Sequence, residues 1–514
     1  MRLVFAIFPL SLYLGLVRSQ IDVKSIPFTS LPGLELLLKT ERELLVNLEN
    51  YANALEAKAI VLQSAIAEMR EENLKSVEDA ETYLSNSLNS FALIRRMHTD
   101  WLQWELYMQS PVGEAEIVIN QNLSINLPSS KVMDQVTDAM HRLQITYDLQ
   151  PIQMAAGLFY GIQYNASFSS RDCFEIGQRL LSQGDIFYSS QWLYAAIEHY
   201  KENEVNAIIG FDKLQIYYLY METFLKQYSY DNALKIANIA LDDSPNNAKF
   251  LQAQSLIQHN MKISKEKPMQ FTTSEFDSHF HCCRGEFDKR LKLLHCRYNS
   301  TTHPFLKLAP FKMEEVLMDP YMVLYYDVIS DAEIAEIKEI TRLHLRPALV
   351  YDESKKEYTT HMGRTSHHSP LPDNASITTE RIMQRVTDLS GFDVKGSEVT
   401  SVVNYILAAQ HRPHYDFFNV SKQNEMVQGV GNRIATVVFY LSDVDQGGST
   451  VFPHLNVSVF PRKGSALMWY NLNNRGEIDE RTLHASCPVI FGSKWIATKW
   501  IREHPQMFRR PCFK

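Results

Sequence analysis

The most regular pattern near the start of the chain is an apolar repeat with alternating spacings of four and three residues. It runs from Leu34 to Met69, and all but one of its positions are apolar. Such a heptad pattern predicts a long amphipathic helix with a coiled-coil seam. A second amphipathic stretch, from Leu84 to Trp104, predicts further helix. The two stretches fit either an intramolecular helical hairpin or a coiled-coil dimer.

Helical periodicity continues with a different rhythm from residue 165 to residue 258. The segment from Asp231 to Pro245 resembles the second helix and proline stop of a tetratricopeptide repeat. The region is rich in tyrosine, which is typical either of a helical core or of a groove for polyproline II peptides. The candidate groove residues are Tyr188, Tyr217, Tyr218 and Tyr220.

Beyond residue 310 the pattern changes to short apolar strands separated by Gly, Pro, Asn and Asp turns. Many short strands at this spacing predict a β-barrel or jelly roll with a few flanking helices. The predicted fold is therefore α+β and multidomain. Its parts are a helical region at 20–145, a tetratricopeptide-like all-α domain at 165–258, a linker at 259–309 and a β domain at 310–514.

The first residues form an apolar run that does not follow the helical spacing of the later segments. Arg2 precedes an apolar run that ends near Val17, and a polar segment follows Ser19. This pattern predicts a secretory signal peptide at residues 1–19. The alternative, an uncleaved membrane anchor, would need about 20 apolar residues. Sequons such as Asn122-Leu-Ser also agree with a glycoprotein of the secretory pathway. No later segment has 18 uninterrupted apolar residues, so no membrane insertion is expected.

Composition narrows the possible function classes only a little. The chain has 514 residues, of which 45% are hydrophobic and 21% charged, which excludes collagen-like and largely disordered proteins. Its net charge of −8 argues against nucleic acid as the main partner. Six cysteines are too few for a disulfide scaffold.

Candidate metal ligands occur within the β region. His414 and Asp416 are two residues apart, and on a strand such residues point to the same face. His484 follows in another segment and can supply a third ligand. Two imidazoles and one carboxylate are the ligand set of non-haem Fe(II) oxygenases, in which open positions remain for an oxo-acid cosubstrate and O2.

Lys494 is a candidate cosubstrate-binding residue. It lies ten residues after His484, at the start of an apolar strand. A lysine inside a β-barrel is costly unless its ammonium group meets a carboxylate. The distal carboxylate of 2-oxoglutarate would supply that partner. The alternative is a lysine that extends its ammonium group to solvent at the strand end.

Several motifs in order resemble the catalytic domain of the collagen prolyl 4-hydroxylase alpha subunit. The heptad region resembles the dimerisation region of that family, and the Tyr-rich helices resemble its peptide-substrate-binding domain. The motifs are His414-Tyr415-Asp416, the segments 431–440, 447–453 and 469–472, His484–Val489, Lys494-Trp495, and the landmark cysteines Cys283 and Cys296.

The resemblance implies a reaction and its cofactors. His414, Asp416 and His484 would hold Fe(II), while Lys494 and Tyr405 would bind the far carboxylate of 2-oxoglutarate. The enzyme would use O2 to hydroxylate C4 of proline in X-Pro-Gly sequences of collagen-like peptides, releasing succinate and CO2, and L-ascorbate would keep the iron reduced. Its partner would be protein disulfide isomerase, the beta subunit of an alpha2beta2 tetramer, in the endoplasmic reticulum lumen.

The same resemblance implies two disulfides. Cys487 would pair with Cys512, and Cys283 or its neighbour Cys282 would pair with Cys296. Cys173, which lies in a predicted helix, is expected to be a buried thiol.

Three positions depart from the family pattern. Arg502 stands where the family has a histidine that orients the C1 carboxylate of the cosubstrate, so we take it as a cofactor-binding residue. His504 would share its face if the strand continued. Pro370 replaces a tryptophan of a mobile loop, and Ile406–Ala409 replaces a more flexible Gly-rich turn.

The leading hypothesis is therefore the alpha subunit of a procollagen-proline 4-dioxygenase. The alternatives are a prolyl hydroxylase of non-collagen secreted peptides and a weakly active peptide-binding paralogue. A lysyl hydroxylase is disfavoured, because the family expectation there is arginine at the position of Lys494.

Overall fold

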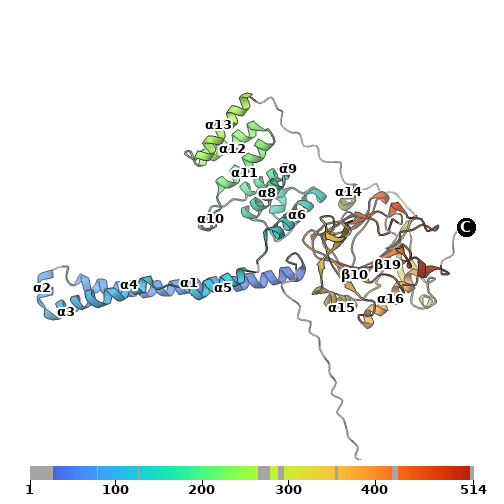
Figure 1. Ribbon diagram of the computed structural model, residues 1–514, viewed down its shortest axis with the longest axis horizontal. Helices are drawn as coiled ribbons and strands as arrows, with labels where there is room; N and C mark the ends of the chain where they lie inside the picture. The colour runs from blue at the N-terminus through green and yellow to red at the C-terminus, as the bar shows by residue number, and fades with distance from the viewer. Residues whose placement is uncertain are drawn as a thin grey trace, which may run out of the picture. The chain divides into compact units, whose positions relative to one another are not determined.

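The computed structural model describes residues 27–77, 79–125, 127–263, 278–286, 295–352, 357–419 and 427–509. The chain divides into a helical unit, Leu31–Ser129, and a larger unit formed by the remaining residues (Figure 1). The predicted signal peptide at 1–19 and Cys512 lie outside the described residues. Within the described ranges, no helix is both long and apolar enough to cross a membrane.

The helical unit is a hairpin built on one 44-residue helix, α1 (Leu31–Leu74). The returning chain packs against it, and side-chain hydrogen bonds from Asn47 and Lys58 join the arms. Asn47 Nδ2 donates to Glu116 O at 2.7 Å, and Lys58 Nζ donates to Ser110 O at 2.6 Å. The returning arm consists of α2 (Ala80–Ser85), α3 (Ser87–Arg95), a π-helical turn (Arg96–Asp100), α4 (Trp101–Gln109) and α5 (Glu114–Ser124).

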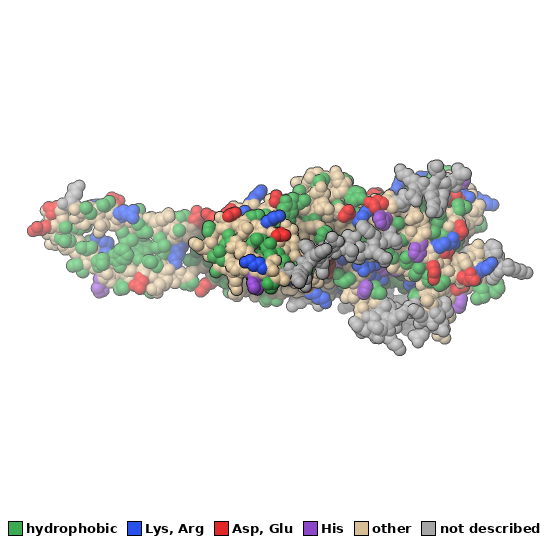
Figure 2. Space-filling model, turned by 90° about the horizontal axis from the view of Figure 1, so that it is seen from above, with side chains coloured by type: hydrophobic (Ala, Val, Ile, Leu, Met, Phe, Trp, Pro, Cys, Tyr) green, Lys and Arg blue, Asp and Glu red, His purple; other side chains and the backbone are tan. Residues whose placement is uncertain are grey.

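The hairpin leaves much of its apolar surface uncovered. Leu48 is 64% exposed and Leu55 is 45% exposed, although both belong to the predicted seam. On the face seen in Figure 2, hydrophobic side chains gather on this unit, at the left end, between polar and charged groups. Contiguous exposed apolar surface of this kind is typical of an interaction site.

The next helices pack in sequence order, α8 on α9, α11 on α12 and α12 on α13. A capping box between Ser169 and Asp172 begins α8, and Gly184, with φ 88°, ends it. Trp192 and Phe250 are buried in this region. The elements are α6 (Ser130–Tyr147), α7 (Pro151–Ala155), β1 (Leu158–Phe159), β2 (Ile162–Gln163), α8 (Ser170–Gln183), α9 (Ile186–Glu198), α10 (Glu204–Ile208), α11 (Lys213–Lys226), α12 (Tyr230–Asp243) and α13 (Ala248–Ile263).

Helix α6 belongs to the larger unit, although the helical region was predicted to extend to residue 145. Two buried side chains explain this difference. Arg142 Nε donates to Ala408 O at 3.0 Å, and Tyr147 Oη donates to Pro488 O at 2.6 Å. The helix is therefore anchored to the β region by contacts that the local sequence pattern does not reveal.

The β region contains a nine-stranded and a four-stranded antiparallel sheet, which confirms the predicted mixed organisation with a β-rich C-terminal part. Helices α15 (Asp331–Arg342) and α16 (Ile377–Ser390) flank the larger sheet (Figure 1). In sheet order, the nine strands are β3 (Cys296–Asn299), β4 (Phe311–Met318), β5 (Tyr321–Tyr326), β16 (Ala466–Tyr470), β12 (Arg433–Tyr440), β19 (Lys494–Arg502), β10 (Thr400–Tyr405), β9 (His367–Leu371) and β6 (Arg346–Pro347).

The smaller sheet carries the histidine strands. Its order is β11 (His411–His414), β17 (His484–Ser486), β14 (Thr450–Phe452) and β15 (Val457–Val459). Residues from both sheets, including Tyr405, Phe452 and Trp469, share one buried core. Two short ladders complete the β region, β7 (Leu349–Asp352) with β8 (Glu357–Thr360), and β13 (Gln446–Gly447) with β18 (Val489–Phe491).

The segment predicted as a linker contains structure that belongs to the β region. Strand β3 pairs with β4 and forms one edge of the larger sheet. Helix α14 (Ser278–Arg284) packs against β14 and β15. The β region thus begins before the predicted boundary at residue 310, because residues 278–284 and 296–299 contribute to its packing.

The structure contradicts the expected pairing of Cys283 or Cys282 with Cys296. Cys283 is bonded to Cys487, and their Cα atoms are 5.7 Å apart. The physical reason is that α14 buries Cys283 against the smaller sheet, whereas Cys296 is exposed on the edge strand β3. Cys487 is therefore bonded to Cys283, which contradicts the expected pairing of Cys487 with Cys512. Cys173 is a buried free thiol as predicted, and burial raises its pKa to about 12.

This disulfide gives a direct test. Peptide mapping under non-reducing conditions should recover Cys283 linked to Cys487. Replacing both residues by serine should lower the free energy of unfolding by about 2–5 kcal/mol, because the bridge closes a long loop of the unfolded chain. Urea unfolding measures this loss. Recovery of a peptide linking Cys283 to Cys296 would contradict the structure.

Gly447 ends the short strand β13, at a register shift in its pairing with β18, in a conformation that favours glycine. Its φ is 76°, and a Cβ there would lie 2.6 Å from Pro488 O and 2.9 Å from Tyr147 Oη. Gly447→Ala should therefore lower the free energy of unfolding by about 2–4 kcal/mol, since backbone strain and overpacking add. Gly210→Ala is the matched control, because Gly210 has a φ of 65° but open space around it. Equal losses in urea unfolding would refute the close packing at Gly447.

Candidate active site

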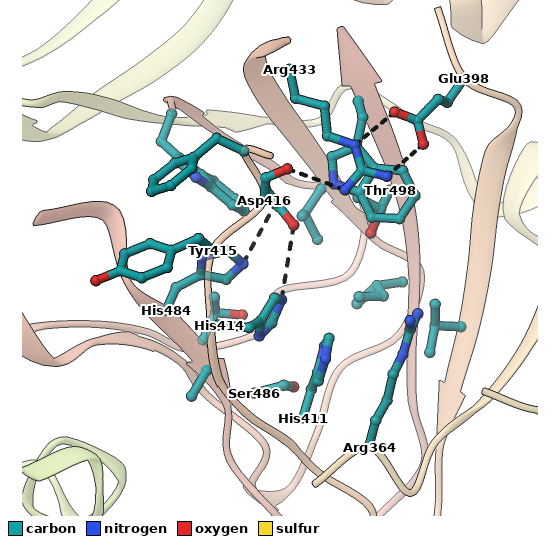
Figure 3. A pocket seen from close by; sticks show the side chains of 18 of the residues that line it. Arg364, Glu398, His411, His414, Tyr415, Asp416, Arg433, His484, Ser486 and Thr498 are labelled. Atoms are coloured by element: carbon teal, nitrogen blue, oxygen red, sulfur yellow. Dashed lines mark hydrogen bonds and ion pairs between the residues drawn. The ribbon is translucent and has the colours of Figure 1, made fainter. Parts of the chain in front are cut away.

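The structure brings the three predicted metal ligands together. His414 and His484 are directly paired across β11 and β17, and Asp416 follows two residues after His414. One potential ligand atom from each residue lies within 4.8 Å of the others. Figure 3 shows the three side chains converging at one end of a pocket.

Hydrogen bonds orient both imidazoles for metal binding. His414 Nδ1 donates to Arg412 O at 2.8 Å, and His484 Nδ1 donates to Thr482 O at 3.0 Å. Each Nε2 atom then carries the lone pair and faces Asp416, at 3.8 and 3.7 Å from its carboxylate oxygens. Such backbone acceptors on the outer nitrogen are usual for metal-binding histidines.

The protonation states suit a divalent cation. Burial, with the neighbouring His484, lowers the pKa of His414 to about 3, so this imidazole is neutral at pH 7. Burial alone would raise the pKa of Asp416, but the two histidines, Arg433 and a Thr436 hydrogen bond hold it below its usual value. Two nitrogens and one carboxylate are the donor set that Fe(II) oxygenases use. The residues present therefore fit Fe(II).

Asp416 is held by a chain of buried polar groups. Thr436 Oγ1 donates to Asp416 Oδ2 at 2.7 Å, and Asn471 Nδ2 donates to Thr436 Oγ1 at 2.9 Å. The guanidinium of Arg433 also donates to Asp416 O at 3.2 Å. These contacts fix the carboxylate before any metal binds.

The triad opens into a cavity of about 460 Å³. Trp469, Val438 and Ile496 give it apolar walls between the two sheets. Tyr405 and Ser486 also line it. The cavity is large enough for a small organic acid and the end of a peptide side chain.

Lys494 lies directly behind Tyr405 and Ser486. It is fully buried, its Nζ donates to Ser486 Oγ at 2.7 Å, and it stands 5.2 Å from the Tyr405 ring centre. Tyr405 and Lys494 are also cross-strand partners on β10 and β19. Burial lowers the pKa of Lys494 to about 7, and no carboxylate among the described residues counteracts this shift. A buried ammonium without an anion is an obvious place for the anionic end of a ligand.

Arg502 lines the cavity as part of a charged cluster that we define as Arg433, Glu398 and Arg502. Glu398 accepts from Arg433 Nε at 2.6 Å and lies 2.8 Å from Arg502 Nη2. Arg502 Nη1 also donates to Gly431 O at 2.9 Å. The guanidinium predicted to meet the cosubstrate is thus anchored by protein groups, and this cluster adds net positive charge to the wall.

The other departures lie away from the pocket. Pro370 is on β9, where it pairs with Ser401, so it belongs to the larger sheet and not to a loop over the site. His504 follows the end of β19 in a short 3-10 helix (His504–Gln506) and is exposed, so the strand does not continue to it. Leu407 and Ala408 take left-handed φ values of 55° and 54°, so the replaced Gly-rich turn keeps the backbone that glycine favours.

The four candidate tyrosines do not form one cluster. Tyr217 is buried in the helical core, and Tyr188 packs against His141 at 4.7 Å between ring centres. Tyr218 is 40% exposed and contacts Phe250. Tyr220 faces another tyrosine, Tyr194 on α9, with 6.4 Å between the ring centres.

Sequence reasoning missed several residues of the pocket wall. His411 precedes the predicted His414 by three positions, a spacing that on a regular strand would place it on the other face. Glu398 and Arg433 come from segments far apart in sequence, and no local pattern singles them out. Ser486 lies two residues after His484 on the same strand, so the period of two could have identified it.

Comparisons with known proteins agree with this geometry. Residues 30–161 match the prolyl 4-hydroxylase alpha-subunit N-terminal region, and residues 400–502 match the 2OG-Fe(II) oxygenase superfamily. The prolyl 4-hydroxylase subunit alpha-1 of Rattus norvegicus is 31% identical, with 98% of each chain covered. Subunit alpha-2 of Gallus gallus is 32% identical, with 94% of this chain and 95% of that chain covered.

Solved structures are more distant. A viral collagen prolyl hydroxylase from Paramecium Bursaria Chlorella virus-1, in its 2OG complex, aligns with 35% of this chain and 95% of its own, at 22% identity and a TM-score of 0.29. The family assignment therefore rests on the sequence relatives, which match over nearly the whole chain. The chain belongs to the prolyl 4-hydroxylase alpha-subunit family and is an Fe(II)/2-oxoglutarate-dependent dioxygenase.

Proposed function

We propose that this chain is the alpha subunit of a procollagen-proline 4-dioxygenase that hydroxylates proline in X-Pro-Gly sequences. One observation carries the proposal. A preorganised triad, His414, Asp416 and His484, and a buried ammonium without a carboxylate partner, Lys494, are associated with the same cavity. A dicarboxylate that binds iron with one end and an ammonium with the other fits that arrangement.

Different residues would bind the metal and the distal carboxylate of the cosubstrate. The triad would hold Fe(II) on one side and leave positions open for 2-oxoglutarate and O2. Lys494, with Ser486 and Tyr405 beside it, would hold the distal carboxylate and so set the orientation of the cosubstrate. The apolar walls would exclude water from the reacting groups. Iron bound there supplies the redox chemistry that couples decarboxylation of 2-oxoglutarate to hydroxylation of proline C4.

Arg502 and Arg433 contribute positive potential beside the triad. Glu398 neutralises only part of their charge, so the wall favours an anionic cosubstrate. Arg502 would thereby support binding of the C1 carboxylate without the mobility of a free side chain. This is the role we assign to it in place of the histidine of the family.

The helical parts of the chain would bind the peptide substrate and the partner subunits. The exposed apolar seam of the N-terminal hairpin, including Leu48 and Leu55, would pair with a second alpha chain as a coiled coil. The helices at 165–258, which we assign to a tetratricopeptide-like domain, would bind proline-rich peptide near Tyr194 and Tyr220. Protein disulfide isomerase would complete the tetramer and retain it in the endoplasmic reticulum lumen, where L-ascorbate is the reductant.

A coupled assay tests the proposal. The chain is co-expressed with protein disulfide isomerase, and the purified complex is given Fe(II), 2-oxoglutarate, O2, ascorbate and a (Pro-Pro-Gly) repeat peptide. We expect succinate and 4-hydroxyproline in equal amounts. Succinate without hydroxyproline, together with hydroxylation of other secreted proline-rich peptides by mass spectrometry, would point to a non-collagen substrate. Absence of both products with retained peptide binding would support the peptide-binding paralogue instead.

A further inference from the structure

His411 reaches the active-site cavity through an irregularity in its strand. On β11 the paired positions His411 and His414 are three residues apart, whereas their partners on β17, Ser486 and His484, are two residues apart. One extra residue in β11 therefore forms a β-bulge. A bulge re-aims side chains next to active sites, and here it turns His411 and His414 to the same side.

The two rings are in direct contact as a result. The ring centres of His411 and His414 are 3.5 Å apart with 24° between their planes, which is a parallel stack. His484 contacts His414 differently, at 4.3 Å and 55°. His414 is thus confined by a ring on each side, and Figure 3 shows His411 beside it in the pocket.

The backbone holds His411 on both sides. It pairs with Ser486 of β17 and forms a bridge to Arg364. The adjacent residue is also fixed, since Arg412 N donates to Gly363 O at 2.7 Å. Arg412 O is the acceptor for His414 Nδ1, so the same bulge supplies both the stack and the hydrogen bond that orients the metal ligand.

We propose that His411 is a positioning residue for the metal site, acting through the face of its ring on His414. The inference rests on the proposed Fe(II) site and adds a residue outside the triad. The hydrogen bond from Nδ1 fixes one edge of the His414 ring but still lets the ring tilt about that edge. The stacked His411 ring limits this tilt. Without it, the Nε2 atom would lose the direction that converges with Asp416 and His484.

Three substitutions separate the ring from its nitrogens and its volume. His411→Ala removes the ring, His411→Leu fills part of the space without a flat face, and His411→Phe keeps a flat ring without nitrogen. In the purified full-length complex, anaerobic titration with Fe(II), and with Co(II) as a spectroscopic probe, measures metal affinity. We expect a loss of about 10-fold or more for the Ala and Leu variants, the range found when outer-shell support is lost. The Phe variant should stay within about threefold of the wild type.

The visible spectrum of bound Co(II) gives a readout that a purely structural role would not move. It should change in the Ala and Leu variants and be restored in the Phe variant, while the melting temperature without metal separates loss of folding from loss of metal. His259→Ala, at an exposed position on α13, is the control.

These measurements distinguish a failure of the proposed function from a failure of the role proposed for His411. If the wild type binds neither ion, the proposed function falls. If the wild type binds metal and His411→Ala binds it equally well, or if the Phe variant is as weak as the Leu variant, only the role of His411 is overturned.

Discussion

Replacing Asp416 by asparagine should abolish turnover and weaken Fe(II) binding by at least about 100-fold, the upper end of the losses seen for outer-shell partners alone. Asp416 is the single anionic ligand beside two imidazoles, and its pKa is held low by those imidazoles, Arg433 and Thr436 despite burial. Asparagine keeps the shape but removes the charge. It also presents an amide to the Thr436 hydroxyl, which now donates to a carboxylate oxygen at 2.7 Å. Anaerobic Fe(II) titration and succinate release measure the two effects.

The variant should keep the rest of the protein intact, because Asp416 contributes no contact to the helical domains among the described residues. Binding of a proline-rich peptide should therefore match the wild type. Asp242→Asn, at an exposed position on α12, is the matched control and should change neither measurement. Retained iron affinity in the Asp416→Asn protein would show that the metal is not held by this triad.

Part of this site could be predicted because strand geometry is local. The period of two predicted His414 and Asp416 on one face of a strand. Strand β11 ends at His414 and Asp416 lies in the bend after it, yet the two side chains still converge. Tyr405 and Lys494, which the family resemblance linked, prove to be cross-strand partners. Strand β12 (Arg433–Tyr440) is one of the short apolar strands predicted beyond residue 310, and it is buried along nearly its whole length.

The rest could not be predicted, because it depends on how distant segments meet. His411 lines the pocket only because one residue is inserted in β11 relative to β17, and a bulge leaves no mark in the hydrophobic pattern. Cys283 bonds to Cys487 across a sequence separation of 204, a choice set by the packing of α14. The pairing of Arg502 with Glu398 likewise needs β19 and the segment before β10 to be adjacent.

The affinity for 2-oxoglutarate should fall by about tenfold for each pH unit above pH 7, so that it is about 100-fold weaker at pH 9. Burial lowers the pKa of Lys494 to about 7 in the free protein, and no carboxylate among the described residues offsets this. A bound carboxylate would favour the charged ammonium. Above pH 7 the lysine must therefore take up a proton when the cosubstrate binds, and below pH 7 it already carries one. Isothermal titration calorimetry with Fe(II) replaced by Mn(II) measures this dependence.

The lowered pKa of Lys494 also makes the stability of the free protein depend on pH. The unfolded chain holds this proton up to the ordinary lysine pKa of 10.5, whereas the folded chain releases it near pH 7. Unfolding therefore takes up a proton between these values, and this group makes the folded state more stable as pH rises through that window. Titrations in two buffers of different ionisation enthalpy should show uptake of nearly one proton per cosubstrate at pH 8.5.

Substitutions identify the titrating group. Lys494→Arg keeps a permanent charge, so its affinity for 2-oxoglutarate should be lower but independent of pH between 7 and 9. Lys307→Met, at an exposed position, should behave as the wild type does. If wild-type affinity were constant from pH 6.5 to 9 with no proton uptake, the ammonium of Lys494 would already be charged in the free site. The unpaired buried lysine would then need another anionic neighbour, and the dicarboxylate orientation proposed for this cavity would lose its main support.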